Sequence, residues 1–174
     1  MSSVSLFLFA AAIAIMIKPL PICASEEANE QLYFKRLKYE HQNRTFAYVS
    51  IKKASEVLKG EPAGEFFQAY YDLEALSQRI YRGYTSALNL DYQPDWFTLL
   101  RGRLAALAVT FITIRPESLI SIIEPYIEKL EQLRALSDPR HKLFFDYIID
   151  QEKVQLDAAR VAKTQGWEQG ARIL

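Results

Sequence analysis

Apolar residues recur at spacings of three and four along most of the chain, a pattern that predicts amphipathic helices. The first predicted helix begins after Ser25, a suitable N-cap, and ends at residues 59–64 ("KGEPAG"), where glycine and proline stop a helix. At a rise of about 1.5 Å per residue it would be about 50 Å long, and we expect the polar residues 41–45 ("HQNRT") to be its weak point. Its predicted buried stripe consists of Phe34, Leu37, His41, Tyr48, Ile51 and Leu58.

The second and third predicted helices differ in character. The second covers residues 65–88, and the loop that follows it, residues 89–95, ends in Asp95, a suitable N-cap for the third helix at residues 96–114. Residues 104–114 ("LAALAVTFITI") carry no charge on any side, which is typical of a central core helix. The predicted buried stripe of the second helix consists of Phe66, Tyr70, Leu73, Ile80, Tyr84 and Leu88.

The C-terminal third of the chain predicts two more helices. The fourth begins near Pro116 and has buried positions at Leu119, Ile122, Ile123, Ile127, Leu130 and Leu133, while Pro125 is expected to kink it or to mark its true start. The fifth covers residues 138–164, ends before Gly166, and is followed by a short closing helix or tail in "WEQGARIL". Its stripe consists of Phe144, Ile148, Gln151, Gln155, Ala158 and Ala162. The predicted fold class is therefore an all-α bundle of four or five helices.

The N-terminal segment predicts export. Residues 4–17 ("VSLFLFAAAIAIMI") are uncharged and have the length of a signal-peptide core, which is shorter than a comfortable membrane span. We expect residues 1–24 to be a signal peptide, cut after Ala24 or Ser25, and residues 25–174 to form a single domain that is periplasmic or secreted. The alternatives are an uncleaved membrane anchor at residues 4–17 and lipidation at Cys23.

Charge and composition exclude several function classes. Twenty-one basic residues balance 21 acidic ones, so the chain has no general attraction to nucleic acid, and we expect membrane contact only through the N-terminal segment. The sequence has no glycine-rich phosphate loop and no paired-cysteine metal motif, and its two histidines are too few for an all-histidine zinc site. We expect His41 to be packed in the core and His141 to be solvated at a helix start.

Acidic residues at helical spacing raise the question of a metal site. Glu152 and Gln155 stand three positions apart, as do Glu65 and Gln68, while Glu40 precedes His41 and the fourth helix offers Glu124, Glu128 and Glu131. In this spacing and in its helix count, the chain resembles the ferritin-like bundles, which bind iron or manganese through glutamates and Glu-x-x-His pairs. The resemblance implies a metal site formed by Glu40, Glu65, Glu128 and Glu152.

The chain departs from the ferritin-like pattern at the two positions where the family has histidine. Glutamine stands at both, and its amide oxygen is a weak ligand for iron or manganese. We therefore predict no bound metal and no cofactor. Glu152 and Gln155 are expected to be structural, with Gln155 hydrogen-bonding across a helix interface and Glu152 at the margin of that interface.

Aromatic residues crowd the second predicted helix and suggest a ligand pocket. Candidate lining residues are Phe66, Tyr70, Tyr84 and His41, which would offer apolar surface with polar handles. The alternative is that these side chains simply fill the core, with Tyr71 and Tyr81 at its rim. The sequence thus predicts an exported, non-enzymatic module that binds a protein or a small apolar ligand. The alternatives are a ferritin-like metal oxidase or its degenerate descendant, and a membrane-anchored accessory protein.

Overall fold

The computed structural model describes residues 26–88 and 115–174, and these two ranges are almost entirely helical. No strand occurs within them, so the prediction of an all-α bundle of four or five helices is confirmed. The elements are α2 (Glu26–Val57), α3 (Pro62–Ala87), α5 (Pro116–Leu136), the 3-10 turn η1 (Pro139–His141), α6 (Lys142–Gln165) and α7 (Trp167–Ala171).

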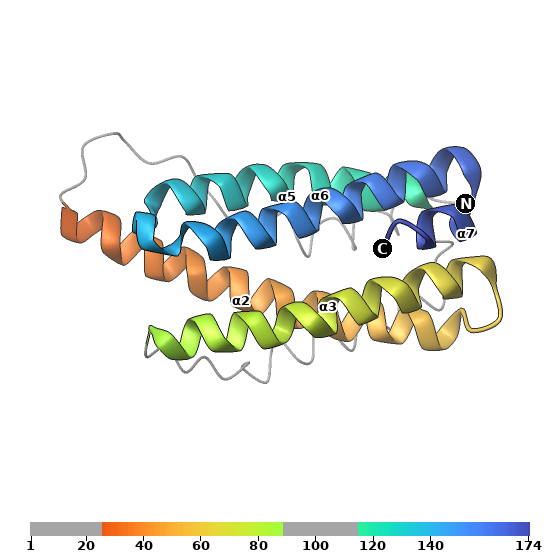
Figure 1. Cartoon of the computed structure of the whole chain (residues 1–174), viewed down its shortest axis with the longest axis horizontal. Helices are drawn as coiled ribbons and strands as arrows, with labels where there is room; N and C mark the ends of the chain where they lie inside the picture. The colour runs from red at the N-terminus through yellow and green to blue at the C-terminus, as the bar shows by residue number, and fades with distance from the viewer. Residues whose placement is uncertain (1–25, 89–114) are drawn as a thin grey trace, which may run out of the picture.

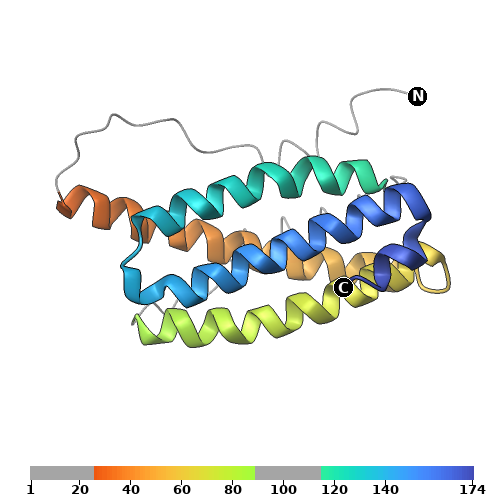
Figure 2. The ribbon, with the colours of Figure 1, turned by 45° about the horizontal axis from the view of Figure 1, so that its top comes forward.

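The four long helices in the described part of the chain form two antiparallel pairs (Figure 1). Helices α2 and α3 pack against each other, and so do α5 and α6. The short helix α7 folds back and contacts both α6 and α3, which closes one end of the bundle. Both views place the end of α3 and the start of α5 at opposite ends, so these two helices run in the same direction (Figure 1, Figure 2).

Proline and glycine set most of the helix ends. Pro62 and Pro116 occupy the first turns of α3 and α5, where the missing N–H costs no helical hydrogen bond. Gly60, at φ +89°, lies in the turn between α2 and α3, and Gly166, at φ +96°, ends α6. Residues with a side chain rarely adopt such angles, so these two glycines fix where the chain turns.

Helix α2 runs through the expected weak point at residues 41–45, and the alternative that Pro125 marks the start of a helix was wrong. The stretch at residues 41–45 does not interrupt α2, because Arg44 pairs with Glu40 one turn earlier and both are buried against other helices. Pro125 is not a helix start: it lies inside α5, which begins at Pro116. The second helix also begins three residues before the predicted Glu65, at Pro62.

The predicted buried stripes differ in accuracy. All six stripe positions of α6 are buried, and in α5 only Ile122 among its six is less than fully buried. In α3 the buried face is rotated from the prediction, because Leu73 and Ile80 are half-buried and Tyr81, expected at the rim, is 0% exposed. The buried residues of α3 are Gly64, Phe66, Phe67, Tyr70, Glu74, Ser77, Tyr81 and Thr85.

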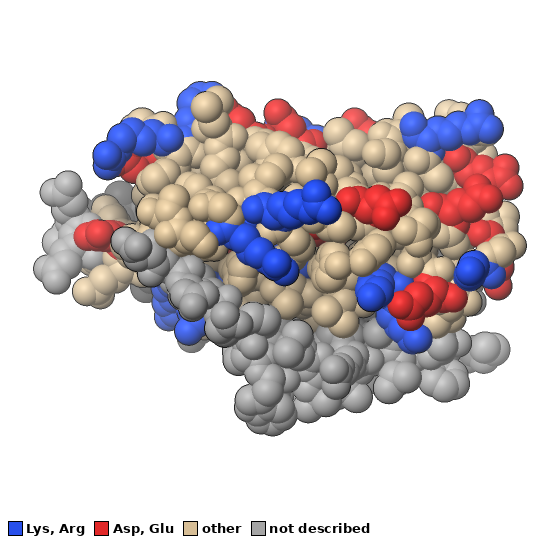
Figure 3. Space-filling view, turned by 60° about the horizontal axis from the view of Figure 1, so that its bottom comes forward, with Lys and Arg blue, Asp and Glu red and all other residues tan. Residues whose placement is uncertain are grey.

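Several predictions lie outside the described residues: the signal peptide with Cys23, the cap at Ser25, the loop after α3 and the third helix at residues 96–114. Within the described ranges, no helix combines the length and the apolar character that a membrane crossing requires. The surface shown in Figure 3 carries acidic and basic side chains interspersed with each other.

Candidate functional site

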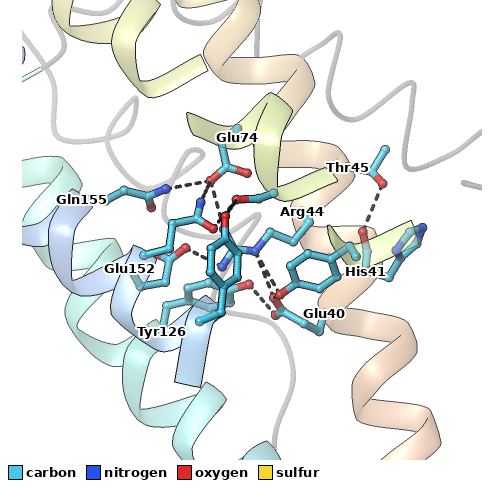
Figure 4. A network of polar contacts seen from close by, with 12 residues as sticks. Glu40, His41, Arg44, Thr45, Glu74, Tyr126, Glu152 and Gln155 are labelled. Atoms are coloured by element: carbon cyan, nitrogen blue, oxygen red, sulfur yellow. Dashed lines mark hydrogen bonds and ion pairs between the residues drawn. The ribbon is translucent and has the colours of Figure 1, made fainter. Parts of the chain in front are cut away.

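The most unusual feature of the interior is a guanidinium group at the centre of the bundle. Arg44 lies near the middle of α2, and its side chain runs into the space between the helices (Figure 4). Only 2% of its surface is exposed. Arginine is almost never buried to this extent without partners, so its surroundings decide its role.

Three carboxylates from three different helices surround Arg44. Its Nε lies 3.2 Å from Oε1 of Glu40 on α2, and its Nη1 lies 3.0 Å from Oε1 of Glu74 on α3. Its Nη2 lies 2.6 Å from Oε1 of Glu152 on α6. None of these four side chains is more than 4% exposed. We call these four residues the Arg44 cluster.

Tyrosine hydroxyls complete the surroundings of Glu40. Tyr81 of α3 donates a hydrogen bond to its Oε1, and Tyr126 of α5 donates one to its Oε2 (Figure 4). Both rings also lie beside the guanidinium, with Cζ of Arg44 5.4 Å and 5.6 Å from their centroids, within the range of a cation–π contact. Tyr126 thereby brings α5 into contact with the Arg44 cluster.

Amide groups of α6 complete the surroundings of Glu74. Its Oε1 accepts hydrogen bonds from Nε2 of Gln151 at 3.1 Å and from Nε2 of Gln155 at 2.8 Å. The carbonyl oxygen of Gln155 in turn accepts a hydrogen bond from the hydroxyl of Tyr70 at 2.8 Å. The second oxygen of Glu74, Oε2, is buried and makes no hydrogen bond with the described residues.

Burial and charge shift the pKa values of the cluster. Burial raises the pKa of Glu152 to about 7, although the neighbouring Arg44 lowers it. Burial opposes the charge of Arg44, but the neighbouring Glu152, and after it Tyr81, Tyr126 and Glu74, outweigh this and hold the pKa of Arg44 well above its ordinary value. Burial also raises the pKa values of Tyr70, Tyr81 and Tyr126, so these phenols stay neutral and remain hydrogen-bond donors.

The structure separates the four residues named as metal candidates. Glu40 and Glu152 lie together beside Arg44, whereas Glu65 and Glu128 are exposed on α3 and α5. Gln68, three residues after Glu65, is also exposed. Only one of the two Glu-x-x-Gln pairs, the one on α6, therefore points into the bundle.

The chemistry around Arg44 suits a guanidinium better than a metal ion. The oxygens of the three glutamates that face the centre of the bundle contact its nitrogen atoms, so the cation they surround is part of the chain itself. In the two described ranges, no group of three or more histidine, cysteine, aspartate or glutamate side chains is arranged to hold a metal ion. This donor set does not fit a dinuclear iron or manganese centre.

The expectation for residues 152 and 155 was half correct. Gln155 hydrogen-bonds across the interface between α6 and α3, as predicted. The predicted position of Glu152 at the margin was wrong, because it is 3% exposed and pairs with Arg44 in the centre. A charged partner on α2 makes this burial possible, and the sequence of α6 alone does not reveal that partner.

The candidate pocket residues are placed apart. Phe66 packs against Trp167 with ring centroids 5.0 Å apart, near α7, whereas Tyr84 stacks on Phe144 at 3.7 Å, near the start of α6. Phe66 and Tyr84 are 18 positions apart on α3, which corresponds to about 27 Å along the helix. Tyr70 lies between them and bonds to Gln155. His41 is buried, as expected, and its ring points away from Arg44 (Figure 4).

No site was predicted at Arg44, Glu74 or Tyr126, and Tyr81 was expected only at the rim of the core. A signal for them was present, because Arg44 falls four positions after Glu40 and seven after Leu37, in helical register with a buried stripe. Glu74 likewise follows Tyr70 by four positions. Charged residues in register with an apolar stripe on more than one helix point to a buried ion-pair cluster.

Comparison with known proteins adds no relative. No family model matches the chain, and no curated protein and no solved structure is significantly similar to it. Inference about function therefore rests on the residues of the chain itself.

Proposed function

We propose that the protein is an exported, non-enzymatic helical bundle that binds a protein or a small apolar ligand, and that the Arg44 cluster holds its helices together. Export is supported by the uncharged residues 4–17, which have the length of a signal-peptide core. The absence of a catalytic role for the cluster is supported by its burial and by the pairing of its charges.

One observation carries the structural role of the cluster. Arg44 is 2% exposed, and each of its nitrogen atoms faces a carboxylate from α2, α3 or α6. A catalytic group must touch its substrate, and these charged groups touch one another instead. Ion pairs between helices inside a bundle fix which helices meet and in which register, a role for which buried polar groups are well suited.

Export is tested on protein from the native host. Intact-mass analysis of the exported fraction should show a chain that begins at Ser25 or Glu26. A soluble cytoplasmic form that retains residues 1–24 would contradict export, and a full-length chain in the membrane fraction would favour the anchor at residues 4–17.

The binding role is tested by native mass spectrometry of the same gently purified material. The exported protein should carry a discrete additional mass, either a partner chain or a small molecule, that dissociates without a change in the mass of the chain itself. A folded monomer with no adduct under these conditions would contradict a binding module.

The ferritin-like alternative is tested by metal content. Protein purified without chelator should contain far less than one iron or manganese ion per chain, and added Fe(II) or Mn(II) should not raise its melting temperature, because a ligand specific for the folded state must stabilise it. A stoichiometric metal content that is lost in Glu152→Ala would show that the cluster is a metal site.

A further inference from the structure

The charges of the Arg44 cluster do not cancel. Three carboxylates, from Glu40, Glu74 and Glu152, face one guanidinium. Fully ionised, the cluster would carry a net charge of about −2 in an interior where an uncompensated charge is very costly. Such a site lowers its free energy by binding a proton on one of its carboxylates.

Hydrogen bonds distinguish the three carboxylates. Glu40 accepts hydrogen bonds from two phenols in addition to Nε of Arg44. Glu74 accepts from two side-chain amides in addition to Nη1 of Arg44. Donors of this kind stabilise the ionised form of a carboxylate. Glu152 has one polar contact with the described residues, the ion pair with Nη2 of Arg44. Its negative charge is therefore stabilised by fewer donors than that of Glu40 or Glu74.

The groups that face Glu152 come from three other helices. Helix α2 presents Arg44 and Glu40, α3 presents Glu74 and Tyr70, and α5 presents Tyr126. The two phenols are neutral, so among the described residues the charged groups that act on Glu152 are Arg44, Glu74 and Glu40, which lie with it around the guanidinium in Figure 4.

We propose that Glu152 is a proton-binding site in the core, so that the bundle takes up a proton as it folds and loses stability as the pH rises toward neutrality. This inference does not rest on export or on a binding partner. It makes the packing of α6 against α2 and α3 sensitive to pH in the range that cells and their surroundings cover.

The direction in which stability changes with pH follows from proton linkage. The pKa of Glu152 is about 7 in the folded protein and 4.5 for the free side chain. Below pH 4.5 both the folded and the unfolded chain hold the proton, and the full stabilisation is present. Between pH 4.5 and 7 only the folded chain holds it, so stability falls as the pH rises, and above pH 7 this contribution levels off. The whole interval corresponds to a change of about 300-fold in the folding equilibrium constant.

The experiment compares urea unfolding of the wild type, Glu152→Gln and Asp150→Asn from pH 4.5 to pH 8, followed by circular dichroism. Glutamine mimics the protonated carboxyl, and Asp150 provides an exposed acidic control on the same helix. Relative to Glu152→Gln, the folding constants of the wild type and Asp150→Asn should fall by up to about 300-fold across the range. Both histidines are present in all three chains, so their titration does not produce this difference. Parallel curves for the wild type and Glu152→Gln would overturn the proposal.

A second measurement does not need a variant. In wild-type protein labelled with carbon-13, the side-chain carboxyl resonance of Glu152, assigned through its own backbone, should titrate with a midpoint near pH 7. A midpoint below pH 5 would overturn the proposal even if Glu152→Gln failed to fold.

Discussion

Replacing Arg44 by methionine removes the positive charge from the centre of the bundle and keeps much of the side-chain volume. The three carboxylates would remain, each at most 4% exposed, without the nitrogen atoms that now lie 2.6–3.2 Å from them. Removing one partner of a buried ion pair costs about 3–5 kcal/mol. Since three carboxylates share Arg44, we expect the upper part of this range.

A loss of this size is large relative to the whole stability of a domain, which is about 5–15 kcal/mol. Urea unfolding at pH 7, followed by circular dichroism, measures it as a lower midpoint. The matched control is Arg160→Met, because Arg160 pairs with Glu124 and Asp157 at the surface, where the three side chains are 52%, 49% and 64% exposed. Exposed ion pairs contribute little to stability, so the urea midpoint of the control should lie close to that of the wild type.

Two further results would test the cause of the loss. The double variant Arg44→Met/Glu152→Gln should recover part of the lost stability, because one buried charge is removed together with its partner. The defect of Arg44→Met should also shrink at pH 5, where protonation neutralises buried carboxylates. An Arg44→Met protein as stable as Arg160→Met at pH 7 would refute the reasoning, because Arg44 would then not be what balances the buried carboxylates.

Other predictions follow from single positions in the fold. Phe145→Ala should lower the free energy of unfolding by about 3–5 kcal/mol, because Phe145 is 0% exposed. Its control, Leu143→Ala, changes a side chain that is 82% exposed and should leave the melting curve almost unchanged. Equal effects of the two substitutions would contradict the described burial. Gly166→Ala should cost about 1–3 kcal/mol because its backbone, at φ +96° and ψ 161°, suits glycine alone. Gly83→Ala, inside α3 with open space around it, should instead stabilise by about 0.5–1 kcal/mol, and thermal unfolding of both variants should show opposite signs.

Much of the fold was determined by local sequence. Spacings of three and four identified α6 with all six of its buried stripe positions, because an amphipathic helix must turn one face inward whatever its neighbours are. Helix ends were similarly predicted at Pro116 and Gly166, since these residues restrict the backbone by themselves, whereas the start of α3 at Pro62 was placed three residues too late.

The interior chemistry was decided only by tertiary structure. The periodic pattern of α3 could not distinguish a face centred on Leu73 from one centred on Glu74, since a carboxylate is normally assigned to solvent. Glu74 lies 30 residues from Arg44 along the chain, and Glu152 lies much farther still, so no local pattern links them. A buried charge is tolerated only when counter-charges arrive from neighbouring helices, and the packing of those helices exists only in the folded chain.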